Sequence, residues 1–117
     1  MEDRLYARIY LRTDRPGTEI RGVIARAFGG RIDAGTVIVD GLVIATSQSR
    51  FGKIDAPRPD CVEWPISLEV EPEAGMGMDG FVTSVSRILD QAKAAAIEAV
   101  VSCDFEERFA PDFRLNG

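Results

Sequence analysis

The chain has 117 residues, which predicts one domain with one hydrophobic core, and its 45% apolar and 28% charged residues are typical of a folded protein. The net charge is −5, from 14 basic and 19 acidic side chains, and there is no histidine. The absence of histidine excludes imidazole acid–base catalysis, Ser-His and Cys-His nucleophile pairs and histidine-ligated metal sites.

Residues 4–12 alternate between apolar and polar side chains, a period of two that predicts a half-buried strand. The polar face of this strand carries Tyr6, Arg8, Tyr10 and Arg12. From Thr18 onward the apolar residues follow helical spacing, and Gly29-Gly30 marks the predicted end of that helix.

Residues 36–46 are rich in valine and isoleucine and predict strand structure, with Asp40-Gly41 in the middle. An Asp-Gly pair between Val-rich runs is typical of a type I′ hairpin, which would divide the segment into two short strands. We favour one longer strand with a bulge at Gly41, because the return from the first helix needs a strand of useful length. The hairpin stays open as the alternative. Residues 47–60 are predicted to form a polar loop.

Residues 62–71 show the clearest strand pattern in the chain. The apolar face consists of Val62, Trp64, Ile66, Leu68 and Val70, and the polar face of Glu63, Pro65, Ser67, Glu69 and Glu71. Asp79 is the predicted N-cap of a second helix that ends near Ala95. Residues 97–103 are predicted to form the last strand.

The order of these elements is β-α-β-β-α-β, with one apolar stripe on each helix. This pattern predicts an α+β fold of the ferredoxin-like type. We expect a four-stranded antiparallel sheet in the order 4-1-3-2, with both helices on one face. Residues 1–104 would form this domain, and residues 105–117 would form a C-terminal aromatic and acidic tail.

The charge is distributed unevenly between the two halves of the chain. Residues 1–59 hold 10 basic and 7 acidic side chains, whereas residues 60–117 hold 4 basic and 12 acidic ones. In the predicted strand order the first strand, with Arg8 and Arg12 on its outward face, lies beside the third strand, whose outward face carries Glu63, Glu69 and Glu71. Opposite charges on neighbouring strands stabilise a sheet by roughly 0.2–1 kcal/mol per pair. We therefore expect the unmatched negative charge on the last strand and the tail.

The predicted topology places Cys61 and Cys103 on strands that another strand separates, about 9–10 Å apart. A disulfide needs Cα atoms within about 7 Å, so we predict free thiols and a reducing, cytoplasmic setting. The residues Glu2-Asp3-Arg4 lack a signal-peptide pattern, and no apolar run approaches the roughly 18 to 20 residues of a membrane span. We expect no membrane association.

No motif predicts a catalytic, metal or cofactor site. Cys103 beside Asp104 lacks a histidine or cation that would lower its pKa. The carboxylates of the third strand have no metal-ligand spacing, and the glycines before the second helix do not match a phosphate-binding loop. Tyr6 and Tyr10 are placed like the stacking aromatics of RNA-binding sheets, but the acidic neighbouring strand argues against nucleic acid.

The segment that begins at residue 105 contains three phenylalanines at intervals of four, among acidic residues. Either it folds back over the open sheet face near Tyr6 and Tyr10, or it is an exposed motif that docks a partner or a second copy. The candidate partner-binding residues are therefore Tyr6, Arg8, Tyr10, Glu69, Asp104, Phe105, Glu106, Glu107, Phe109 and Phe113.

The run Val-Ser-Cys-Asp-Phe-Glu-Glu at residues 101–107 comes after a strand that ends in Glu-Val-Glu-Pro. The second half of the chain thereby resembles a group of small uncharacterised bacterial proteins of similar length, whose last strand likewise ends in Cys-Asp-Phe-Glu. No activity is established for that group, so the resemblance implies kinship and no site. By analogy, some small acidic bacterial proteins act as immunity or inhibitor partners of toxins.

These features favour a non-enzymatic protein-interaction module, of the immunity or inhibitor kind, that presents an acidic surface and the aromatic tail to a partner. An acidic surface suits a basic partner through electrostatic steering, and deletion of residues 105–117 is expected to leave the fold intact. One alternative is a small-molecule-binding or enzymatic domain that uses the open sheet face around Tyr6, Arg8, Tyr10 and Glu69. Another is a homodimer without further chemistry. We expect no cofactor and no metal.

Overall fold

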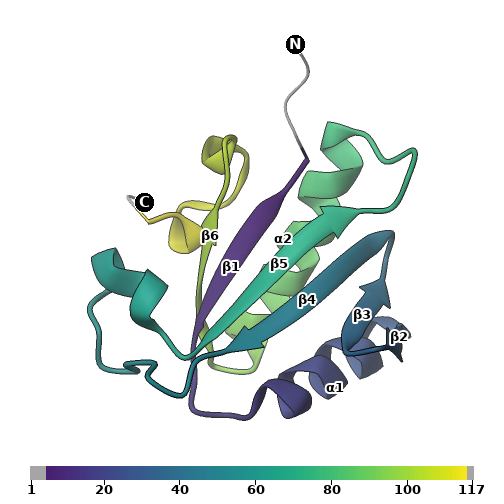
Figure 1. The fold of residues 1–117 in the computed structure, drawn as a ribbon. Helices are drawn as coiled ribbons and strands as arrows, with labels where there is room; N and C mark the ends of the chain where they lie inside the picture. The colour runs from purple at the N-terminus through teal and green to yellow at the C-terminus, as the bar shows by residue number, and fades with distance from the viewer. Residues whose placement is uncertain (1–4, 116–117) are drawn as a thin grey trace.

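The computed structural model describes residues 5–115. Two α-helices, α1 (Gly17–Phe28) and α2 (Met78–Ala94), lie behind one face of an antiparallel sheet in Figure 1. The strands are β1 (Ala7–Arg12), β2 (Arg31–Asp33), β3 (Thr36–Val39), β4 (Leu42–Gln48), β5 (Ile66–Pro72) and β6 (Glu98–Ser102). Short 3₁₀ helices are η1 (Arg58–Glu63), η2 (Glu106–Arg108) and η3 (Pro111–Phe113).

Within residues 5–115 the sheet has six strands in the order β2-β3-β4-β5-β1-β6, and all neighbouring strands are antiparallel. The prediction of a four-stranded ferredoxin-like sheet is therefore wrong. The additional strands arise from two tight turns. Asp40 (φ 50°) and Gly41 (φ 79°) join β3 to β4, and Ala34 (φ 51°) and Gly35 (φ 82°) join β2 to β3.

Positive φ at both central residues is the geometry of a type I′ turn, whose twist suits a two-residue hairpin. The single bulged strand expected over residues 36–46 is wrong, and the hairpin alternative is confirmed. A long strand is not needed after α1, because β2 supplies the first extended segment and every residue of β4 pairs with β5.

Alternation and helical spacing predict β1 and α1, although β1 begins at Ala7, after residues 5 and 6, and residue 4 of the predicted strand lies outside the described residues. Ala7, Ile9 and Leu11 of β1 are buried against the helices, whereas the intervening side chains are half-buried on the opposite face. Helix α1 ends at the predicted glycine. Gly29 adopts left-handed φ (64°), and the backbone N–H of this cap donates a hydrogen bond to the carbonyl of Ala25.

The strand predicted to start at residue 62 begins only at Ile66, because η1 occupies the residues before it. Pro57 and Pro59 cannot donate ladder hydrogen bonds and suit the start of a helical turn. Val62, expected inside, is consequently 68% exposed. The predicted N-cap of α2 is also displaced, since the helix begins at Met78.

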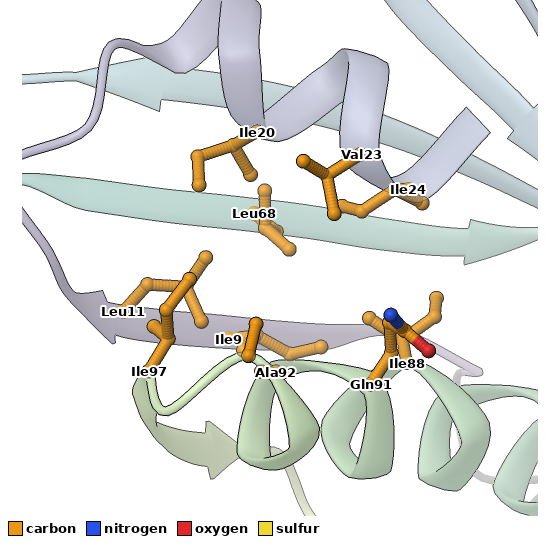
Figure 2. Close-up of a pocket in the computed structure, with 11 residues that line it drawn as sticks. Ile9, Leu11, Ile20, Val23, Ile24, Leu68, Ile88, Gln91, Ala92 and Ile97 are labelled. Carbon is orange, nitrogen blue, oxygen red and sulfur yellow. The ribbon is translucent and has the colours of Figure 1, made fainter. Parts of the chain in front are cut away.

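The helix-covered face of the sheet, here named the helix face, forms the main core. A small cavity lies where α1 and α2 both approach β1 and β5, and Figure 2 shows the side chains that line it. Its volume is about 30 Å³. All its lining side chains are apolar except Gln91. A space of this size holds little more than one water molecule, so the cavity is a packing gap between the helices.

The opposite face of the sheet, here named the outer face, is covered at one end only. There η1 and the residues around it form a second cluster. It consists of Ala56, Cys61, Trp64 and Val100, with Tyr10 and Leu115 packed against it. Cys61 and Cys103 are both free, as predicted, although Cys61 lies in η1 and not at the start of a strand.

Candidate functional site

The outer face carries an open hollow of about 520 Å³ beside the start of β1 and the end of β6. Its lining residues are Tyr6, Arg8, Tyr10, Ser102, Cys103 and Asp104. The strand register explains why residues of β1 and residues after β6 line the same hollow. Arg8 pairs with Ser102, and the antiparallel direction brings the residues after Ser102 to the start of β1. The volume lies within the range of about 300–1,000 Å³ that is typical of binding pockets.

Arg8 lies in the hollow and forms an ion pair with Glu69, which faces it directly on β5. Tyr10, Glu69 and Tyr6 raise the pKa of Arg8 above its usual range, against the opposing effect of burial. Within residues 5–115 its Nε is buried without a hydrogen-bond partner. Arg8 is therefore a fixed cation whose charge is balanced by one neighbouring carboxylate.

Cys103 lines the hollow as a protonated thiol. Burial raises its pKa to about 11, and the nearby carboxylates of Glu106, Asp104 and Glu107 also raise it, against a backbone hydrogen bond at Phe105. Because the thiolate is the reactive form of cysteine, the thiol is a poor nucleophile at neutral pH. Its neighbour Asp104 therefore does not activate it.

The Cys103 side of the hollow has an acidic rim. Asp104 is exposed and forms no ion pair among residues 5–115, and η2 begins two residues later with Glu106 and Glu107. The three carboxylates lie close enough to act on the thiol of Cys103. The rim therefore presents negative charge to the solvent.

The covered end of the outer face forms a packed wall beside Tyr10. The guanidinium of Arg12 lies over the ring of Trp64, 4.7 Å from its centroid, and donates to the carbonyl of Ala56 at 2.9 Å. Trp64 Nε1 donates to the same carbonyl at 2.9 Å. Arg58 and Arg12 both ion-pair with Glu98, at 2.9 Å and 3.5 Å. The wall thus has few free polar groups.

The three tail phenylalanines lie in the core rather than on the surface. Phe105, Phe109 and Phe113 are 3%, 1% and 6% exposed, and all pack into the helix-face core. The ring of Phe105 contacts Phe81 of α2 edge to face, with centroids 6.0 Å apart, and stacks on Phe109 at 6.2 Å. They are therefore not available as an exposed docking motif, and they do not cover the face near Tyr6.

Polar contacts attach the same segment to the rest of the chain. Arg114 donates to the carbonyls of Phe109 and Glu107 and forms a parallel bridge with Val101 of β6. Lys93 of α2 ion-pairs with Asp112 at 2.7 Å. Up to residue 115, the segment expected to be a tail therefore packs as part of the domain.

The structure brings together five of the ten residues that the sequence analysis proposed, at the hollow and its ion pair. These are Tyr6, Arg8, Tyr10, Glu69 and Asp104. Glu106 and Glu107 do not line the hollow but lie near Cys103, whereas the three phenylalanines pack in the helix-face core. Ser102 and Cys103 were missed as lining residues, because their place beside Arg8 depends on the register between β1 and β6.

Among residues 5–115 no group of three acidic or cysteine side chains is placed to hold a metal ion. None of the helices described is long and apolar enough to span a membrane. Comparisons with protein-family models, with curated proteins and with solved structures found no match, so the resemblance of residues 101–107 to a bacterial group gains no support from them.

Proposed function

We propose that the protein is a non-enzymatic protein-interaction module whose contact surface is the outer face around the hollow. The observation that carries this proposal is the convergence of two tyrosines, an arginine and an exposed carboxylate in one open concavity. Tyrosine and arginine are among the residue types enriched at protein interfaces and at the positions that contribute most of the binding energy.

The chemistry of the hollow supports binding over catalysis. Arg8 keeps its proton at neutral pH, as guanidinium groups in proteins do, and the thiol of Cys103 keeps its proton because burial raises its pKa to about 11. Neither group exchanges a proton at neutral pH, as a general acid or base must. The proposed surface differs from the one first expected, because the phenylalanines of the last segment are buried.

A random peptide library displayed on phage, selected against the full chain, tests the proposal. Ser102→Tyr places a bulky side chain at an exposed position in the hollow, and Thr83→Tyr places the same side chain at an exposed position on α2, on the opposite side of the sheet. We expect most independent clones to lose binding to Ser102→Tyr and to keep binding to Thr83→Tyr. Clones that bind both variants equally would refute the proposed surface.

A small-molecule site is a second candidate for the same hollow, because its volume of about 520 Å³ fits a metabolite-sized ligand. A metabolite library screened by thermal shift separates the two. A hit whose stabilisation disappears in Ser102→Tyr favours the small molecule, whereas peptide binding without such a hit favours the protein partner.

A further inference from the structure

We infer that the hollow binds a basic side chain, arginine or lysine, from a protein partner. This inference rests on the proposed function and names the chemistry that the surface recognises. It draws on three features of the hollow: the charge of its rim, the two aromatic rings that line it and its concave shape.

The net charge around the hollow is negative after the ion pair of Arg8 with Glu69 is set aside. Arg8 and Glu69 neutralise one another across β1 and β5. The carboxylate of Asp104 then remains on the lining, with Glu106 and Glu107 beyond it. Among residues 5–115 these carboxylates have no ion-pair partner, so a cation that enters the hollow meets negative charge, whereas an anion meets carboxylates and an arginine that already has a partner.

The aromatic lining suits the same ligand. Tyr6 and Tyr10 are both half-buried beside Arg8. The faces of tyrosine rings attract guanidinium and ammonium groups, which also lose little hydration when their alkyl stem lies on a ring. A basic side chain can thus place its stem on the tyrosines and its charged end at Asp104.

The concave shape favours a protruding partner over a second copy. Two identical hollows placed face to face would enclose roughly twice the 520 Å³ of one hollow and leave the space unfilled. A single side chain from a convex segment fills one hollow and brings the opposite charge.

Chemical-shift mapping of the ¹⁵N-labelled full chain with three capped pentapeptides tests this inference. Each peptide has one central residue between glycine pairs: arginine, its neutral isostere citrulline, or glutamate. We expect the arginine peptide to cause saturable shifts at residues 6–10 and 102–104. The citrulline peptide should bind at least about threefold more weakly, and the glutamate peptide should cause no shift at these residues.

Asp104→Asn and Asp90→Asn form a matched pair of variants, because both remove an exposed carboxylate and only the first lies at the hollow. Asp104→Asn should weaken the binding of the arginine peptide by about fivefold, and Asp90→Asn should leave its affinity unchanged. Equal binding of the arginine and glutamate peptides, equal effects of the two variants, or shifts confined to α2 would overturn the inference.

Two further results keep this inference separate from the proposed function. Library peptides that lose binding to Ser102→Tyr but contain no basic residue would refute the inference and leave the proposed surface standing. Shifts at the hollow that grow with protein concentration alone, together with a dimer in sedimentation, would identify a second copy as the occupant and would overturn the inference as well.

Discussion

Phe109→Ala should strongly destabilise the protein, because the ring of Phe109 belongs to the main core. Its side chain is 1% exposed and its ring stacks on Phe105, which in turn contacts Phe81 of α2. Removal of a buried phenyl ring typically costs about 3–5 kcal/mol of unfolding free energy, from the lost transfer energy and the cavity left behind.

This loss is large compared with the whole stability. A chain of 117 residues has an expected unfolding free energy of about 6–18 kcal/mol, so one ring accounts for a substantial fraction of it. At roughly 4 °C per kcal/mol, the melting temperature should fall by about 12–20 °C. Deletion of residues 105–117 removes three such rings and should unfold the domain, contrary to the expectation drawn from the sequence.

Urea unfolding followed by circular dichroism measures the change, and Phe51→Ala is the matched control. Phe51 is 81% exposed, so its truncation should change stability by no more than about 0.5 kcal/mol. A loss below about 1 kcal/mol for Phe109→Ala, with an unchanged urea m-value, would refute the placement of the C-terminal segment in the core.

Three other predictions concern single positions. At pH 8 iodoacetamide should modify Cys103 roughly 100-fold more slowly than an unfolded cysteine, with the rate rising toward pH 11, and equal rates in mass spectrometry would contradict the raised pKa. Val23→Ile adds a methyl group at the 30 Å³ cavity and should stabilise the fold by up to about 0.8 kcal/mol in urea unfolding, whereas a loss would show that the cavity is already filled. Gly52→Ala should lower the unfolding free energy by about 1–3 kcal/mol, since a Cβ would lie 2.4 Å from the Cα of Pro65. Gly77 has open space around it, so Gly77→Ala should lower the unfolding free energy far less in the same assay.

Local patterns in the sequence predict the elements that form by short-range rules. The alternation in β1 places Arg8 and Tyr10 on the outer face, and left-handed Gly29 ends α1 as expected. The two hairpins also follow a short-range rule, because each turn has two residues with positive φ. The error there came from a preference for a long strand after the first helix, which the pairing of β4 with β5 makes unnecessary.

The errors beyond the sheet arise where tertiary packing decides. Trp64 follows strand alternation in the sequence, yet η1 turns it into the small cluster with Val100 on the outer face. Phe105, Phe109 and Phe113 have the spacing of a surface stripe, but two short 3₁₀ helices and Arg114 direct them into the core. Spacing alone does not distinguish a buried stripe from an exposed one.

The hollow was predictable only in part, because it depends on which strands lie side by side. The outer-face residues of β1, and the meeting of its arginines with the glutamates of β5, follow from alternation and strand order, whereas the specific pair Arg8–Glu69 depends on the register between the two strands. The lining by Ser102 and Cys103 requires the register between β1 and β6, which no pattern in the sequence specifies.

The most direct test of the central claim compares the affinities of library-selected peptides for Ser102→Tyr and Thr83→Tyr. If the outer face around the hollow is the contact surface, most peptides should bind Ser102→Tyr at least about tenfold more weakly than Thr83→Tyr, a difference of roughly 1.4 kcal/mol. Equal affinities for the two variants, with both variants folded, would contradict the claim.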